Sequence, residues 1–273
     1  MHRHSGAPAQ LLRSIVRHRQ LIFEMIRRDV VGRYRGSVGG LVWSFINPLL
    51  MLAVYTFVFS VVFKARWGTP LESGNSGFAI ILFMGLIVHA LFAECINKAP
   101  GLILSNVNYV KKVIFPLEIL PVVALGSALF HMLVSVVILL VFHWLIASKV
   151  HLTVLWLPVV MLPFALLTLG VAWFLAATGV FVRDISQTTG ILTTVLVFLA
   201  PVFYPASALP ERYRPYLNLN PLTFIIEEAR AVTIWGNMPD LLGLSLYSGI
   251  ALLVGAGGFW WFQRTRSGFA DVL

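Results

Sequence analysis

The sequence contains little charge and a single cysteine. Only 11% of its 273 residues are charged whereas 59% are hydrophobic, a balance that excludes a water-soluble fold. The lone Cys95 excludes both an intrachain disulfide and a zinc site built from several cysteines. We interpret it as a small buried apolar residue.

The motifs of membrane enzymes and of ATPases are also missing. No Gly-Lys pair occurs, which excludes a phosphate-binding loop, and neither H-E-x-x-H nor G-x-S-x-G is present. His131 and His143 are twelve residues apart, about 18 Å along a helix, so they cannot share a metal. We therefore predict no catalytic residue, no metal and no cofactor on this chain. If the protein uses ATP and Mg²⁺, a separate ATPase binds them.

The sequence does contain six long uncharged runs. Each predicts a membrane-spanning helix, because a bilayer core of about 30 Å requires about 20 apolar residues in a helix. The fold class is therefore an all-α polytopic membrane protein, with an N-terminal segment 1–40 and a transmembrane domain 41–273. The predicted spans are residues 41–63, 78–97, 117–146, 152–182, 186–205 and 241–262.

The positions of the basic residues explain the formal charge of +9. Eight of the twenty Lys and Arg precede residue 41, beside the first apolar run, where lipid phosphates are the nearest anions. We therefore expect membrane lipids and no nucleic acid as partners. The connections on the side of both termini carry fourteen of the twenty, so the positive-inside rule places both termini in the cytoplasm.

Two segments before the third span are not plain spans. Residues 9–31 alternate apolar and charged side chains at helical spacing, which predicts an amphipathic helix on the cytoplasmic leaflet, either functional or a simple anchor. The loop 98–116 is partly apolar yet cannot span a membrane. It predicts a short helix that docks on a protein surface or rests on lipid headgroups. This helix would present Asn106, Asn108, Tyr109, Lys111 and Lys112.

A third unusual segment, residues 201–221, holds five of the fourteen prolines. Because proline breaks helices, we predict that the fifth span breaks near its outer end and continues as short helices at the external face. The alternative is an ordinary external loop. Glu227 and Arg230 follow it three residues apart, and we interpret them as a surface ion pair.

Aromatic side chains gather on two of the predicted spans. They either stack on sugar rings along a polymer channel or anchor the helices at the membrane interface. The residues are Trp43, Tyr55 and Phe59 on the first span, and Phe198, Phe203 and Tyr204 on the fifth.

Four strings, in order along the chain, resemble one family. They are "RRDVVGRYRGSVGGLVWSFINPLLMLAVYTFVFSVVF" from Arg27, "NKAPGLILSNVNYVKKVIFPLEILP" from Asn97, "GVFVRDISQ" from Gly179 and "APVFYPASALPERYRPYLNLNPLTFIIEEAR" from Ala200. The chain resembles the membrane subunits of bacterial ABC exporters for polysaccharides, which include O-antigen, capsule and teichoic acid permeases.

The resemblance implies a homodimer in the bacterial inner membrane, with two copies of a separate ABC ATPase beneath it. It implies that residues 98–113 form a coupling helix, with Arg183 and Asp184 as a second ATPase contact, and that the proline-rich segment is a gate. The six aromatic residues become candidates for the channel and gate. The substrate would be a polysaccharide on polyprenyl pyrophosphate, which suits the charges of Arg27, Arg28, Arg33 and Arg35. Alternatives are a small-molecule or drug ABC permease, a membrane enzyme for lipid-linked sugars, and a passive scaffold.

Overall fold

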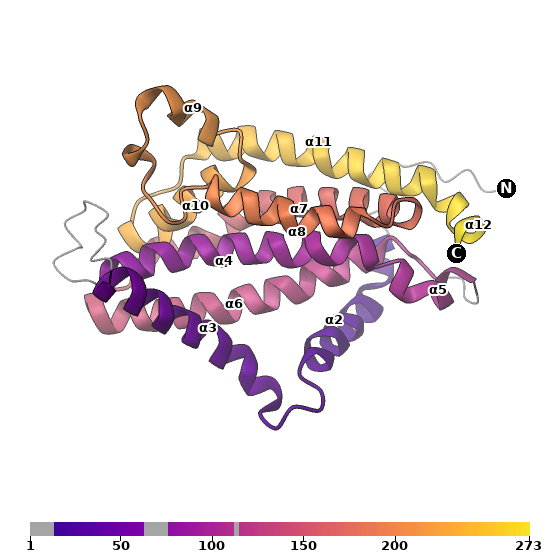
Figure 1. Cartoon of the computed structure of the whole chain (residues 1–273), viewed down its shortest axis with the longest axis horizontal. Coiled ribbons are helices and arrows are strands. Elements are labelled where there is room, and N and C mark those ends of the chain that lie inside the picture. The colour runs from indigo at the N-terminus through magenta and orange to yellow at the C-terminus, as the bar shows by residue number, and fades with distance from the viewer. Residues whose placement is uncertain (1–13, 63–75, 112–114) are drawn as a thin grey trace.

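The computed structural model describes residues 14–62, 76–111 and 115–273, and every regular element in this part of the chain is helical. The helices are α2 (Arg19–Arg33), α3 (Trp43–Tyr55), α4 (Ser76–Lys98), α5 (Val107–Lys111), α6 (Ile119–Ala147), α7 (Leu157–Phe181), α8 (Ile185–Phe198), α9 (Arg214–Leu217), α10 (Pro221–Arg230), α11 (Leu241–Thr265) and α12 (Phe269–Val272). Figure 1 shows α4, α6, α7, α8 and α11 running along one common direction as a bundle.

Within the described residues, five helical segments are long and apolar enough to cross a membrane. They cover Gly40–Val58, Gly77–Gly101, Ile119–Ala147, Leu152–Phe181 and Leu241–Val272. The prediction of an all-helical polytopic membrane protein is confirmed. The fifth predicted span is shorter than expected, because α8 has 14 residues and ends at Phe198, a length of about 21 Å against a bilayer core of about 30 Å.

Helix α4 lies at the centre of the bundle and α3 at its edge. In the 18-residue window that is the most apolar of each span, 72% of the residues are buried for the span that contains α4 and 11% for the span that contains α3. Helices α7 and α11 pack closely because glycines face one another: a Cβ added to Gly170 would lie 2.7 Å from the Cα of Gly255. The core therefore combines large side chains around α4 with a glycine contact between α7 and α11.

The two ends of the bundle differ, and we name them by the helices that lie there. The α5 end carries α5 and α12, whereas the α9 end carries α9 and the loops around it (Figure 1). The C-terminal ends of α4, α7 and α11 all reach the α5 end. At this end the turn that follows α4 packs on α7, since a Cβ added to Gly179 would lie 2.7 Å from the Cα of Pro100.

Helices α2 and α3 form a V whose apex stands away from the bundle (Figure 1). The turn at the apex contains Gly36 and Gly40 with φ angles of 86° and 48°, values that favour glycine. Helix α2 packs on α6, with Ile22 and Val30 buried, whereas Glu24 and Arg27, among others on its opposite side, are exposed. The predicted amphipathic pattern of residues 14–31 is thus present, and its apolar side contacts protein; residues 9–13 lie outside the described part.

Candidate functional site

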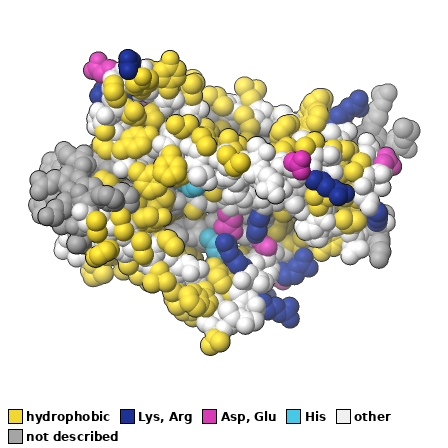
Figure 2. All heavy atoms as spheres, in the orientation of Figure 1, with side chains coloured by type: hydrophobic (Ala, Val, Ile, Leu, Met, Phe, Trp, Pro, Cys, Tyr) yellow, Lys and Arg dark blue, Asp and Glu magenta, His cyan; other side chains and the backbone are white. Residues whose placement is uncertain are grey.

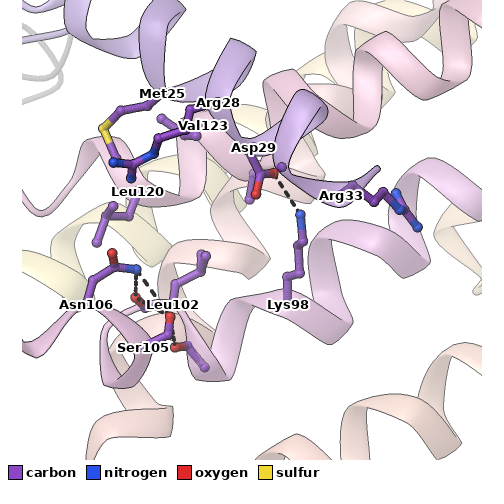
Figure 3. A pocket seen from close by; sticks show the side chains of 13 residues that line it. Met25, Arg28, Asp29, Arg33, Lys98, Leu102, Ser105, Asn106, Leu120 and Val123 are labelled. Atoms are coloured by element: carbon purple, nitrogen blue, oxygen red, sulfur yellow. Dashed lines mark hydrogen bonds and ion pairs between the residues drawn. The ribbon is translucent and has the colours of Figure 1, made fainter. Parts of the chain in front are cut away.

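A cavity of about 620 Å³ lies between α2, the segment after α4, and the start of α6. Its polar lining comes from two elements far apart in the sequence and is dominated by cations. Figure 3 shows Asp29 on α2 facing Lys98 at the end of α4, whereas Arg28 on α2 points toward Leu120 and the wall that holds Ser105 and Asn106. Arg33 extends from the edge of the cavity.

Carboxylates partner two of these cations. The Lys98 ammonium lies 2.8 Å from an Asp29 carboxylate oxygen and 3.9 Å from Glu94. Glu94 also accepts a 2.8 Å hydrogen bond from Arg33, and its other oxygen lies 3.1 Å from Nδ1 of His131. A network of five ionisable side chains therefore joins α2, α4 and α6. Figure 2 shows charged and histidine side chains gathered in a hollow within an otherwise apolar face.

The electrostatics of the cavity keep Asp29 ionised. Burial alone would raise the pKa of Asp29, but the hydrogen bond and the charge of Lys98 outweigh burial and hold that pKa below its ordinary value. Arg28 has a longer contact of 3.4 Å from its guanidinium to the Tyr109 hydroxyl. The arrangement can bind an anion, since a phosphate in the cavity could contact both Arg28 and Lys98.

The predicted phosphate contacts divide between two surfaces. Arg28 and Arg33 line the cavity, whereas Arg27 lines a neighbouring hollow of about 460 Å³ on the exposed side of α2, and Arg35 is exposed in the turn after α2. Sequence reasoning missed Lys98 as a member of this site. Lys98 stands directly at the end of an apolar span and four residues after Glu94, and this position could have indicated that it belongs to the site.

The predicted coupling residues lie at the α5 end. Asn108 and Lys111 are exposed there, while Asn106 donates a 2.9 Å hydrogen bond to the Leu102 carbonyl and lines the cavity instead. The Tyr109 ring stacks on Phe115 at 4.3 Å between centroids. Arg183 and Asp184 are exposed between α7 and α8 at this same end, and Lys112 lies outside the described residues.

Glu118, at the start of α6, fixes the far end of the segment 99–116. One of its carboxylate oxygens accepts a 2.9 Å hydrogen bond from the Ser14 hydroxyl and the other a 2.8 Å hydrogen bond from Arg266. Arg266 also donates to the Phe115 carbonyl at 3.0 Å. Lys98 and Glu118 thus hold the two ends of this segment to neighbouring helices.

The predicted gate aromatics meet where α8 ends. Phe198 stacks on Phe203 at 5.4 Å between centroids, and the Tyr204 hydroxyl donates a 3.0 Å hydrogen bond to the Phe198 carbonyl. Trp43 and Tyr55 lie on α3, on the other side of α4 in Figure 1, so one chain does not bring the two groups together. The side chain of Phe59 lies outside what the structure describes.

One sequence interpretation is wrong at this end of the molecule. Arg230 does pair with Glu227 at 2.9 Å, but it is fully buried and not a surface residue. His89 on α4 is a packing residue, because its Nε2 lies 2.9 Å from the Thr193 carbonyl on α8. Among the described residues, no group of three or more His, Cys, Asp or Glu could hold a metal ion.

Long apolar helices define a multi-pass membrane protein, with a cation-lined cavity and a clamped segment at its α5 end. The sequence matches the ABC-2 type transporter family over residues 20–234, and the chain belongs to this family. It is therefore the membrane subunit of a transporter and not an enzyme, and an ABC ATPase is its partner.

Relatives with assigned names include polysaccharide exporters. The O-antigen export system permease protein RfbA of Myxococcus xanthus is 29% identical over 269 residues, which cover 97% of this chain and 99% of the relative. RfbA of Klebsiella pneumoniae is 23% identical over 93% of this chain and 95% of its own length. The polysialic acid transport protein KpsM of Escherichia coli is 22% identical over 88% of this chain and 90% of its own length.

Proposed function

We propose that this chain is the membrane subunit of an ATP-driven exporter that moves a lipid-linked polysaccharide out of the cytoplasm. Two copies assemble in the bacterial inner membrane with two copies of the ABC ATPase, which binds ATP and Mg²⁺. The observation that carries the proposal is the cation-lined cavity, together with the polysaccharide exporters among the relatives.

In this proposal the cavity receives the pyrophosphate that joins the sugar chain to its polyprenyl carrier. Arg28 and Lys98 contact the phosphates, and Arg33 stands at the edge of the site. Arg27 and Arg35, on the exposed surface beside it, attract the headgroup toward the site. Both termini and the α5 end face the cytoplasm, where the carrier is loaded.

The ATPase contacts the α5 end through Asn108, Lys111 and Lys112, with Arg183 and Asp184 as a second contact. The segment 99–116 transmits its movement because charged side chains fix both of its ends. Asn106 and Tyr109 act from the cavity side of the segment.

The polymer leaves through a channel between the two protomers, past the aromatic cluster at the end of α8. Phe198, Phe203 and Tyr204 line the outer mouth, and Trp43 and Tyr55 of α3, with Phe59 in the segment after it, line the path in the assembled dimer. Aromatic faces suit this role, because they contact the C–H faces of sugars without holding any one sugar tightly.

The substrate test follows lipid-linked polymer in cells that lack this chain. We expect polymer on its carrier to accumulate inside the inner membrane and to disappear from the cell surface, with recovery on re-expression. Loss of drug resistance with normal surface polysaccharide would instead indicate a small-molecule permease and refute the proposal.

The headgroup site has its own test, with the purified complex and a farnesyl diphosphate probe. Arg28→Gln and Lys98→Gln are each expected to weaken binding by about ten- to a hundredfold, since each removes a charged hydrogen bond worth about 1.5–3 kcal/mol. Arg214→Gln, an exposed arginine at the α9 end, is the matched control. Equal binding by all four proteins would remove the cavity from the proposal.

A further inference from the structure

The backbone after α8 carries carbonyl groups that the helix no longer satisfies. Helix α8 ends at Phe198, and residues 200–202 that follow are buried inside the bundle. A buried carbonyl without a donor costs about 1–3 kcal/mol, so these groups require partners from elsewhere. Prolines 201 and 205 have no N–H and cannot supply them.

Side chains supply most of these donors. Asn220 donates a 2.9 Å hydrogen bond to the Leu196 carbonyl, and Tyr204 donates to the Phe198 carbonyl. Arg230, on α10, donates to the carbonyls of Pro201 at 2.6 Å and Val202 at 3.2 Å. The break of α8 is therefore held by side chains of the following segment, in addition to backbone hydrogen bonds from Leu199 to Val195 and from Val202 to Ala200.

Arg230 also reaches the central helix. Its Nε donates a 2.9 Å hydrogen bond to the Ile81 carbonyl on α4, and its guanidinium is oriented by Glu227 at 2.9 Å. Gly85 makes room for this approach, since a Cβ there would lie 2.9 Å from an Arg230 nitrogen and 3.4 Å from the Cα of Val202. One planar, multiply donating side chain thus joins α4, α10 and the broken end of α8.

We propose that Arg230 is the positioning residue of the outer mouth: it fixes the broken end of α8, with its aromatic cluster, against α4, and so keeps the resting channel sealed. The inference rests on the proposed function, because it takes the end of α8 as the external mouth. Arg230 does not contact the polymer. It acts through the carbonyls of Pro201 and Val202.

The test measures leakage of a small trapped anionic dye from proteoliposomes that contain the complex with its ATPase, without nucleotide. Arg230→Lys keeps the charge but loses the planar fork, and we expect dye release at least tenfold faster than from wild type at equal amounts of assembled complex. Gly85→Ala, which crowds the guanidinium while keeping it, is expected to leak less than Arg230→Lys but more than wild type. The control Arg214→Lys should release dye as slowly as wild type, because the Arg214 side chain donates to the carbonyls of Leu209 and Ser207 in its own loop.

A rescue experiment distinguishes a positioning role of Arg230 from a general effect of its replacement on folding. In an Arg230→Ala background, cysteines replacing Gly85 and Val202 are close enough to form a disulfide, and the native Cys95 is buried. We expect this protein to be sealed when oxidised and leaky when reduced. Leakage that is the same in both redox states, or a sealed Arg230→Lys complex, would overturn the assignment.

These readouts do not depend on the identity of the cargo. A seal that follows the disulfide in a protein that exports no polysaccharide would refute the proposed function and leave Arg230 as the positioning residue. Normal polysaccharide export by a complex whose seal is unaffected by replacing Arg230 would support the proposed function and refute the role of Arg230.

Discussion

The contact between Gly179 on α7 and Pro100, in the turn after α4, offers a sharp test of how movement reaches the bundle. Alanine at position 179 would place its Cβ 2.7 Å from the Pro100 Cα, and closer still to the Pro100 carbonyl oxygen. Carbon atoms in ordinary contact are about 3.5–4.0 Å apart, so the backbone of Pro100 must move by about 1 Å. No side-chain rotation can relieve this contact, because the neighbouring atoms are backbone.

Two consequences follow from this displacement in Gly179→Ala. Overpacking of this kind costs about 1–3 kcal/mol, which lowers the melting temperature of the complex by about 2–10 °C. The start of the segment 99–116 also shifts away from α7. If about 1.4 kcal/mol of coupling is lost, polymer export per ATP hydrolysed falls about tenfold while the ATPase remains bound and active.

The assay compares export, ATP hydrolysis and thermal stability in the same purified complex. Gly101→Ala, one residue from Pro100, is the matched control, because a Cβ there meets nothing within 4 Å. We expect this control to behave as wild type. Full export per ATP in Gly179→Ala would show that the contact between α7 and this segment carries no movement, and the reasoning would be refuted.

Three further predictions concern other parts of the chain. Replacing Lys111 and Lys112 with Glu should abolish export and uncouple ATP hydrolysis without affecting membrane insertion. The control Lys149→Glu, at the other end of the bundle, should export normally. Normal export by the Lys111 and Lys112 variant would refute the assigned ATPase contact. Gly258→Val should destabilise the chain in a melting assay, because a Cβ at 258 overlaps the backbone of Gly170, whereas Gly257→Val, with nothing within 4 Å of its Cβ, should melt as wild type. Asp29→Asn should lower the melting temperature by less than about 4 °C at neutral pH, because Asp29 and Lys98 are 38% and 39% exposed. Since the pKa of Asp29 lies below its ordinary value, this difference should persist as pH falls to about 5 and vanish only well below pH 4; a difference that is lost already near pH 6 would contradict the pairing.

The sequence predicted the helical elements well because their signal is local. A run of about 20 apolar residues has few structural solutions in a bilayer, and a cluster of prolines breaks a helix wherever it occurs. The predicted spans overlap the long apolar helices of the described residues, although the first of these helices ends at Val58 and the last at Val272. The fifth span is shorter than predicted, since residues 199–205 are apolar enough to continue a helix and Pro201 and Pro205 stop it.

The sites depend on contacts between distant residues, which periodicity does not reveal. Glu94 and His131 are 37 residues apart and meet only because α4 packs on α6. Arg230 is a further case: three residues after Glu227 it has the spacing of a surface pair, yet its main partners are carbonyls 149, 29 and 28 residues away. The small apolar residues that flank Arg230 directly, Ala229 and Ala231, were the local signal of its position.

The V formed by α2 and α3 has a consequence for how a two-part ligand arrives. Helix α3 meets the bundle toward the α9 end and diverges from it toward the apex, so the hollow beside the V opens across the long direction of the bundle. In the proposed exporter this side would face lipid, and a carrier with an apolar tail and a charged head would enter by lateral diffusion, its tail remaining in lipid while its head passes between the helices. Dehydration of the head would then be the main barrier to entry.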